Sequence, residues 1–184
     1  MQSIRPNRLV SSLVPALLVS ALAACASKPD VRHDKDPAAD LAAYRTFAFF
    51  DPLATDRARY STILSSRLKQ ATREQLERQH YVYSEASPDL RVNLFVNVVE
   101  RQELRATPAG RGFYGYRGWA TSLDTVEYRH GTLAIDLVDT RRNALVWQGV
   151  AEGRLDPKLA NDPGPGVDAV VQQIFAGFPN PQVK

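Results

Sequence analysis

Apolar residues alternate with polar or small ones along residues 131–155, in two runs separated by a polar turn. The first run places Leu133, Ile135 and Leu137 at every second position, and the second places Leu145, Trp147, Gly149, Ala151 and Leu155. A period of two puts each set on one face of a pleated strand, and the aliphatic and aromatic content is typical of strands. We therefore predict a β-hairpin in the middle of a sheet, with its turn at 140–143.

Further strands are predicted at 44–50, 81–83, 90–101 and 122–130. The clearest is 90–101, in which every second residue from Leu90 to Val98 is aliphatic. One face of this strand should be buried and the other half-exposed, as in an antiparallel sheet that helices cover on one side.

Two segments instead show apolar residues at steps of three and four, which predicts amphipathic helices. The first runs from Thr55 or Asp56 to about Gln79, with Tyr60, Ile63, Leu64, Leu68, Ala71 and Leu76 on its apolar face. The second carries Val167, Val170, Val171, Ile174, Phe175 and Phe178, and Gly177 and Pro179 follow as stop signals. We expect one α+β domain over residues 41–180: an antiparallel β-sheet of about five or six strands with two helices packed on one face.

Residues 1–24 have the parts of a cleaved signal peptide. Arg5 and Arg8 form a basic start, an apolar run follows, and Ala24 precedes Cys25. The tetrad Leu-Ala-Ala-Cys at 22–25 resembles the bacterial lipobox, in which the cysteine is lipidated and becomes the first residue of the mature chain. A plain signal peptide with a coincidental cysteine is the alternative.

Cys25 is the only cysteine of the chain, so an intramolecular disulfide is excluded. Several acyl chains would hold it stably, since each buried CH₂ contributes about 0.8 kcal/mol. Ala26 follows the cysteine, and by resemblance to lipoprotein sorting in Gram-negative bacteria it implies the outer membrane, facing the periplasm, with exposure on the cell surface as the alternative. We expect residues 25–40, which are polar and contain prolines, to be a lipidated N-terminus and flexible tether.

The charge balance argues against nucleic acid as a partner. The 184 residues carry a formal charge of +3, and removal of Arg5 and Arg8 with the signal peptide leaves +1. No cluster of lysines and arginines remains that could neutralise a run of phosphates.

Motifs for catalysis, for metal or for a cofactor are not found. The sequence has no nucleophile elbow, phosphate-binding glycine loop or zinc-protease helix, and its three histidines are scattered. The carboxylate pairs Asp136 with Asp139 and Glu100 with Glu103 are expected to be solvated charges. We predict no enzyme; a hydrolase whose site is assembled from scattered residues is the remaining alternative.

Residues 102–120 interrupt the strand pattern and are predicted to form a long loop. Long loops without secondary structure are usually functional or disordered. The candidate binding residues in this loop are Arg111, Tyr114, Tyr116, Arg117 and Trp119. Aromatic rings stack on flat ligands and guanidinium groups pair with anions. The alternative is a flexible hairpin tip whose rings fold back on the sheet.

From about residue 31 to 179 the chain resembles the domain of unknown function 4136 family of bacterial envelope lipoproteins. The resemblance rests mainly on residues 131–153 and on the closing segment 174–179, with weaker support from 40–47, from 87–90 and from the glycine–aromatic loop. It implies an envelope location and an α+β body, and it supplies neither an activity nor catalytic residues.

Together these features predict a non-catalytic envelope lipoprotein that contacts the membrane through its lipid and binds another envelope protein as an accessory factor. A carrier of lipid or glycan fragments is the alternative. Its ligand would occupy the loop or a cleft between sheet and helices.

Overall fold

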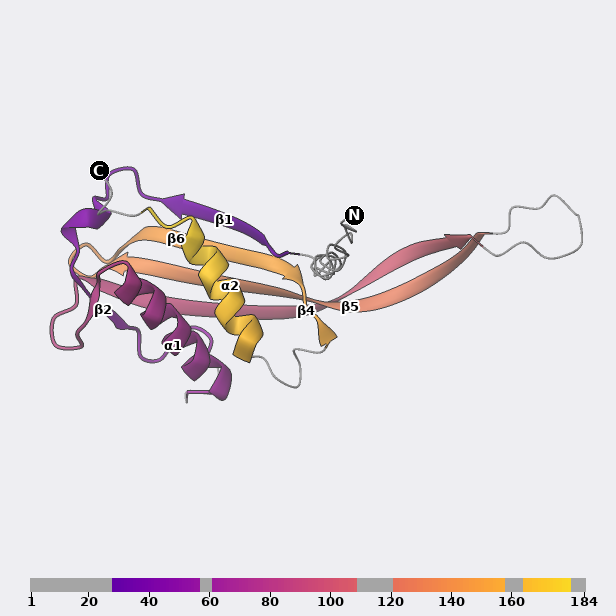
Figure 1. Ribbon diagram of the computed structural model, residues 1–184, viewed down its shortest axis with the longest axis horizontal. Coiled ribbons are helices and arrows are strands. Elements are labelled where there is room, and N and C mark those ends of the chain that lie inside the picture. Colours follow the sequence, from indigo (N-terminus) through magenta and orange to yellow (C-terminus); the bar gives the residue numbers. More distant parts are fainter. Residues whose placement is uncertain (1–27, 57–60, 109–120, 158–163, 180–184) are drawn as a thin grey trace, which may run out of the picture.

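The computed structural model describes residues 28–56, 61–108, 121–157 and 164–179. In chain order its elements are β1 (Asp30–Lys35), a short 3₁₀ helix (Leu41–Ala43), β2 (Thr46–Phe49), α1 (Ile63–Arg78), β3 (Val82–Tyr83), β4 (Leu90–Pro108), β5 (Thr121–Asp139), β6 (Ala144–Arg154) and α2 (Gly164–Ala176). The strands form one sheet in the order β1-β6-β5-β4-β2-β3, and both helices lie on the same face of it (Figure 1). The predicted α+β fold class is confirmed.

The sheet is mostly antiparallel, and β2 is the exception. Antiparallel pairs join β1 to β6, β6 to β5 and β5 to β4, whereas β2 runs parallel to both β3 and β4. Parallel neighbours need a crossover connection, and α1 lies in the segment that joins β2 to β3.

The core lies between the sheet and the two helices. On the sheet side the fully buried residues include Leu90, Val92, Leu94, Ile135, Leu137 and Trp147, and on the helix side they include Leu68, Leu76, Val171 and Ile174. Burying each large apolar side chain contributes about 1.5–3 kcal/mol. These residues recur with a period of two on the central strands and of 3.6 on the helices, as predicted. Each set therefore lies on the face of its element that meets this layer.

Trp147 is the centre of this layer. Its ring lies 5.0 Å from that of Phe178 and 5.5 Å from that of Phe175, measured between centroids. It also stacks on His33, whose Nε2 lies 2.7 Å from the carbonyl oxygen of Ile174. Strand β1 and the end of α2 therefore meet over one tryptophan.

One part of the predicted hairpin is wrong because β6 contains a β-bulge. Alternation predicts Leu145 on the same face as Trp147, but Leu145 is 46% exposed and Val146 is fully buried. The pairs are Leu137 with Trp147 and Val138 with Leu145, so Val146 is an extra residue in β6. An extra residue shifts the alternation by one position, which moves Leu145 off the core face.

Part of the predicted tether is folded as strand β1. Residues 30–35 pair with β6 from Glu152 to Trp147 and form one edge of the sheet. Its side chains are mostly exposed and charged, as is common for an edge strand. The sequence pattern there is polar because little of this strand contacts the core.

Helix α1 begins later than predicted. Thr62 caps it, since its hydroxyl accepts from the backbone N–H of Ser65, whose own hydroxyl accepts from that of Thr62. Ile63, predicted on the apolar face, is 78% exposed, while Leu68, Ala71 and Leu76 are buried as expected. Tyr60 falls among the residues that the structure does not describe.

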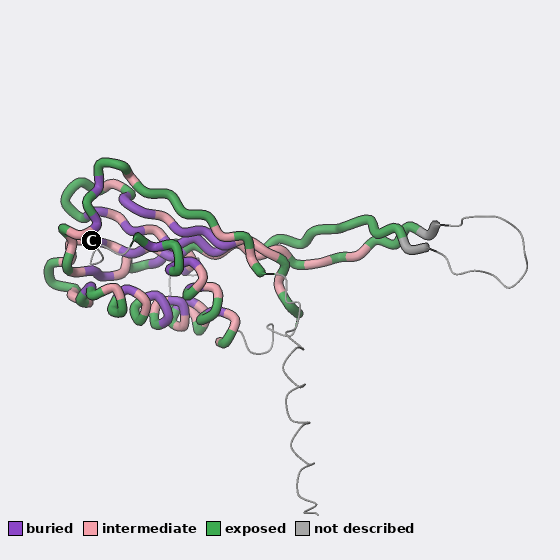
Figure 2. The backbone as a smooth tube through the Cα atoms, turned by 45° about the horizontal axis from the view of Figure 1, so that its top comes forward, coloured by how far each residue is buried: buried purple, intermediate pink, exposed green. Residues whose placement is uncertain are grey.

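Strands β4 and β5 are longer than predicted and leave the body of the protein together. Each has 19 residues, and they pair without interruption from Leu90 with Asp139 to Pro108 with Thr121. Residues 102–108, predicted as loop, are therefore strand. We call residues 99–108 and 121–130 the arm; it projects from the sheet as a two-stranded ribbon (Figures 1 and 2).

Candidate interaction surfaces

The arm is the most exposed regular structure in the described chain. Residues 99–106 of β4 are all exposed, and on β5 residues 123–130 are exposed or intermediate (Figure 2). Its least covered apolar side chains are Leu104 and Leu123, which are 72% and 69% exposed. In solution a two-stranded ribbon is at best marginally stable by itself.

The two leucines share one face of the arm. Leu104 is opposite Thr125 and Ala106 is opposite Leu123, so both leucines continue the face that buries Leu94 within the body. The other face of the arm carries Arg101, Glu103, Arg105 and Asp124 among its residues, and these are exposed.

The predicted binding loop is attached to the far end of this arm. Arg111, Tyr114, Tyr116, Arg117 and Trp119 all fall within 109–120, outside the described residues. Their neighbours Pro108 and Thr121 form the last pair of the ribbon. Sequence reasoning missed the arm, because residues 102–108 mix charges with single apolar residues and no core requires a regular alternation there. Ala24 and Cys25 lie before the first described residue.

A shallow hollow of about 280 Å³ lies between α1 and the edge of the sheet formed by β2 and β3. Phe49 and Tyr83 form its aromatic wall, and Lys69, Gln70 and Arg73 line it from α1. The guanidinium carbon of Arg73 lies 4.5 Å from the centroid of the Tyr83 ring. Arg73 Nε also donates to Glu77 Oε1 at 2.7 Å, so the charge of Arg73 is partly balanced. Aromatic faces beside Lys69 suit a small anion with a flat apolar part.

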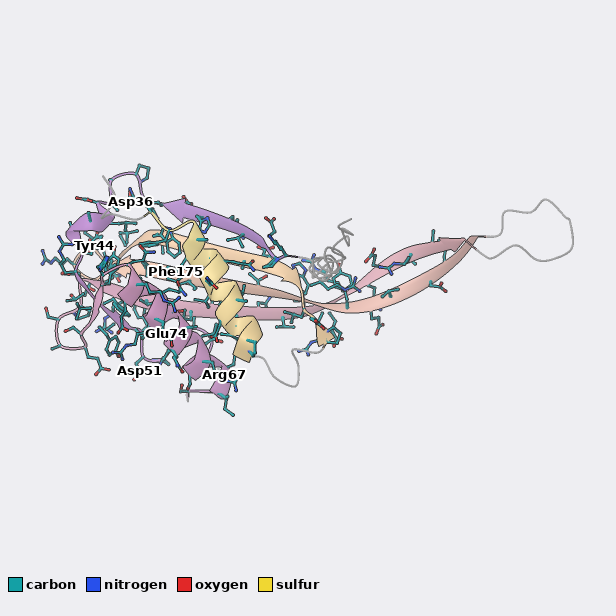
Figure 3. The ribbon with its side chains drawn as sticks, viewed as in Figure 1. Asp36, Tyr44, Asp51, Arg67, Glu74 and Phe175 are labelled. Atoms are coloured by element: carbon teal, nitrogen blue, oxygen red, sulfur yellow. The ribbon has the colours of Figure 1, made fainter. Side chains whose placement is uncertain are left out.

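Asp139 is the centre of a polar network at the end of the sheet opposite to the arm. Its carboxylate accepts hydrogen bonds from the backbone N–H groups of Arg141 and Arg142, from Arg142 Nε at 2.9 Å and from the Tyr44 hydroxyl at 2.8 Å. Arg142 Nη1 also lies 3.3 Å from Asp36 Oδ2. Figure 3 shows Asp36 and Tyr44 at this end of the molecule.

The prediction that Asp139 is a solvated charge is wrong: its side chain is 8% exposed. The backbone N–H of Arg142 and the other donors hold its pKa far below the usual range, against the effect of burial. A carboxylate engaged by four donors is poorly suited to accept a proton from a substrate. The network instead joins the β5–β6 turn to the β1–β2 connection.

A second carboxylate fastens β4 to β2. Asp89 Oδ2 accepts from the backbone N–H groups of Arg45 and Thr46, at 2.8 and 3.0 Å, and from the Thr46 hydroxyl at 3.1 Å. The N–H of Arg45 is the main reason that the pKa of Asp89 is lowered. Both carboxylates hold the ends of strands in place through hydrogen bonds.

The histidines stay apart. His33 contacts α2, His80 adopts a left-handed backbone (φ 68°) after α1, and His130 Nε2 lies 4.0 Å from Glu152 Oε2 at the root of the arm. Within the described residues, no group of three or more histidines, cysteines and acids could hold a metal ion. Among the described residues, no helix is long and apolar enough to span a membrane.

Comparison with known families identifies the chain. The model of the family described as "Domain of unknown function (DUF4136)" matches residues 31–180, and the chain belongs to this family. No curated protein matches it.

Solved structures resemble it at low identity. A PDZ domain protein from Parabacteroides distasonis is 14% identical with a TM-score of 0.53, over 83% of this chain and 36% of that one. This chain thus spans about a third of that protein, and the likeness concerns the fold alone. A variant of PelC from Paraburkholderia phytofirmans, described as a dodecamer, has a TM-score of 0.45 at 13% identity, over 83% of this chain and 95% of that one. A minor lipoprotein from Acinetobacter baumannii has a TM-score of 0.39 at 10% identity, over 73% and 91%.

Proposed function

We propose that this protein is a non-catalytic lipoprotein of the bacterial envelope that binds another envelope protein as an accessory factor. The observation that carries the proposal is the arm, an exposed ribbon whose last pair, Pro108 with Thr121, flanks the candidate binding loop in the sequence. A packed body with a projecting arm is suited to contact between proteins. The polar clusters described above are engaged in holding strand ends, which favours a role without catalysis.

The position of the anchor supports this function. Cys25, the proposed lipidation site, precedes β1 by few residues, so the chain between them spans at most about 20 Å at roughly 3.5 Å per residue. Asp30 begins β1 opposite Glu152, and β6 ends two residues later beside His130 at the root of the arm. A lipid on Cys25 would therefore hold the arm close to the membrane surface. We place the protein at the outer membrane, facing the periplasm.

Photo-crosslinking in living cells tests the proposal. A photoreactive residue at Tyr116 or Trp119 is expected to capture a defined envelope protein, because both positions lie in the candidate binding loop. The matched control is the same residue at Glu74, which is exposed on α1. Equal products from Glu74 and from the loop would contradict the proposed site.

The hollow at Phe49 and Tyr83 supports a second function, the carriage of a small anionic lipid or glycan fragment. Its volume is slightly below the 300–1,000 Å³ of common ligand pockets. The space between sheet and helices is occupied by the core side chains, so the hollow is the better position for a ligand. Mass spectrometry of small molecules that co-purify with the protein, compared with a Lys69→Ala/Arg73→Ala variant, tests it. Identical extracts from the two proteins would dismiss this function.

A further inference from the structure

Strand β4 has a free edge along the arm. Beside the body this edge is covered, because Phe50 N–H donates to the carbonyl of Val92 and Thr55 N–H to that of Leu94. Backbone groups alternate in direction along a strand, so the even-numbered residues of β4 point toward this edge. Beyond Leu94 no described strand pairs with it. The N–H and C=O groups of Gln102, Leu104 and Ala106 are therefore directed outward.

We propose that this edge pairs with the same edge of a second copy of this chain, antiparallel and centred on Leu104. A two-fold axis perpendicular to the sheet would then place Leu104 opposite the second copy's Leu104, with their backbone groups in register. The two arms become one four-stranded sheet in the order β5-β4-β4-β5. Three or more strands with an apolar face are stable where two are marginal.

Charge complementarity allows this register, and Leu104 decides it. A centre on Gln102 would also oppose opposite charges, Arg101 to Glu103, but it would place Leu104 opposite Glu100. With Leu104 at the centre, Glu103 of each copy lies opposite Arg105 of the other, which gives two pairs of opposite charge. Glu103 is 49% exposed, with Arg154 Nη1 at 3.8 Å as its only ion pair in the described chain, so it can accept a second partner. A centre on Glu103 instead would oppose Arg101 to Arg105 twice, and like charges at opposite positions are destabilising.

The same register accounts for the exposed leucines. Leu104 and Leu123 lie on one face of the arm, two residue pairs apart along the ribbon, and pairing across the axis brings both leucines of each copy into one apolar cluster. The paired segments, residues 100–108, extend about 30 Å at about 3.3 Å per residue. The two bodies remain at opposite ends of the joined arms.

Charge reversal in the full-length chain tests the pairing. Sedimentation velocity of the purified protein in detergent should show a dimer, and Glu103→Arg or Arg105→Glu alone should weaken it by about tenfold. The double variant Glu103→Arg/Arg105→Glu should restore it, because the opposed charges are exchanged together. Arg101→Glu is the matched control; it lies on the same face of the same strand but meets an uncharged position of the second copy.

Cysteine crosslinking gives an independent measurement. Leu104→Cys places two thiols opposite each other across the axis, where Cα atoms about 5.5 Å apart permit a disulfide. Leu123→Cys is equally exposed but lies on β5, away from the paired edge, and the wild-type chain with Cys25 gives the background. Faster dimer formation by Leu104→Cys than by Leu123→Cys supports the pairing.

Three results would overturn the proposal: a monomeric wild-type chain at every concentration, a double variant no better than the single ones, or equal crosslinking at residues 104 and 123. Loss of the dimer in Arg101→Glu would instead reject the centre at Leu104. None of these results depends on capture of another protein through the loop, so this proposal and the proposed function fail separately.

Discussion

Single side chains decide how the ends of the strands are held. Asp139 is an acid in a turn that the sequence presents as an ordinary surface charge, yet it is buried and accepts hydrogen bonds from Arg142, Tyr44 and the turn itself. A hydrogen bond to a charged group contributes about 1.5–3 kcal/mol, more than a neutral one, because burial removes competing water. Stability at this end of the sheet therefore depends on one ionised carboxylate.

We predict that Asp139→Asn lowers the free energy of unfolding by about 2–4 kcal/mol, since it leaves buried donors without their anionic acceptor. The folded pKa of Asp139 is depressed below the unfolded value of about 3.9. Its contribution is thus complete above about pH 5 and is lost as the pH falls. Urea unfolding at pH 7 and at pH 3 measures this: the difference between wild type and variant should shrink at pH 3. A constant difference would show that the charge is not what stabilises the turn.

Gly149 on β6 is a second residue on which packing depends. A Cβ atom there would collide with Ile174 of α2 and with the ring of Trp147. We predict that Gly149→Ala destabilises the protein by about 1–3 kcal/mol, because overpacking forces the helix away from the sheet. Thermal unfolding followed by circular dichroism measures it. Gly153→Ala is the control, since its Cβ would be 3.3 Å from the nearest atom, and an equal loss in both variants would contradict the explanation.

At the scale of elements, the body and the arm differ in what holds them. The body is a sheet covered by two helices, whose core residues have exposed fractions of a few percent. The arm consists of the same two strands continued beyond their cover, and the described side chains of the arm are not buried. Backbone pairing and exposed side-chain contacts, such as the 2.9 Å hydrogen bond from Gln102 Nε2 to Glu127 Oε1, maintain it. The arm is therefore the part of the described protein whose sequence is least constrained by packing.

We predict that the arm can be removed without unfolding the body. A chain in which Asn-Gly joins Val99 directly to His130 closes the hairpin with a two-residue turn. Its melting temperature should change by only a few degrees, because the described arm residues bury little apolar area. Circular dichroism and thermal unfolding measure it. A large loss of stability would show that the arm is part of the core, and the shortened chain should also lose self-association.

At the scale of the whole molecule, the start of β1, five residues after Cys25 in the sequence, and the root of the arm lie at the same end of the sheet. Lipidation at Cys25 would then bring the arms of neighbouring copies together on one surface, where confinement raises their effective concentration. The proposed dimer and the proposed membrane location therefore support each other physically, although each has its own test.

We predict that Cys25→Ser prevents acylation and releases the protein from the membrane. One acyl chain gives marginal binding and several give stable binding, so removing all of them should move the protein to the soluble fraction. Metabolic labelling with a palmitate analogue, followed by fractionation of the envelope, measures both effects. Ala26→Ser, which keeps the cysteine, is the control. An unlabelled wild-type chain would reject the anchor.

Local patterns by themselves determined the fold class, the hairpin at 131–155, the two helices and most core residues, because periods of two and of 3.6 report directly which face is buried. Leu145 departs from this pattern only because a bulge adds a residue to β6. Tertiary structure decided the rest. β1 is a strand because β6 offers it an edge, and 102–108 are strand because β5 continues opposite them. Asp139 is buried because Tyr44, distant in sequence, closes over it. In each of these three cases the partner lies elsewhere in the chain, and no local pattern records it.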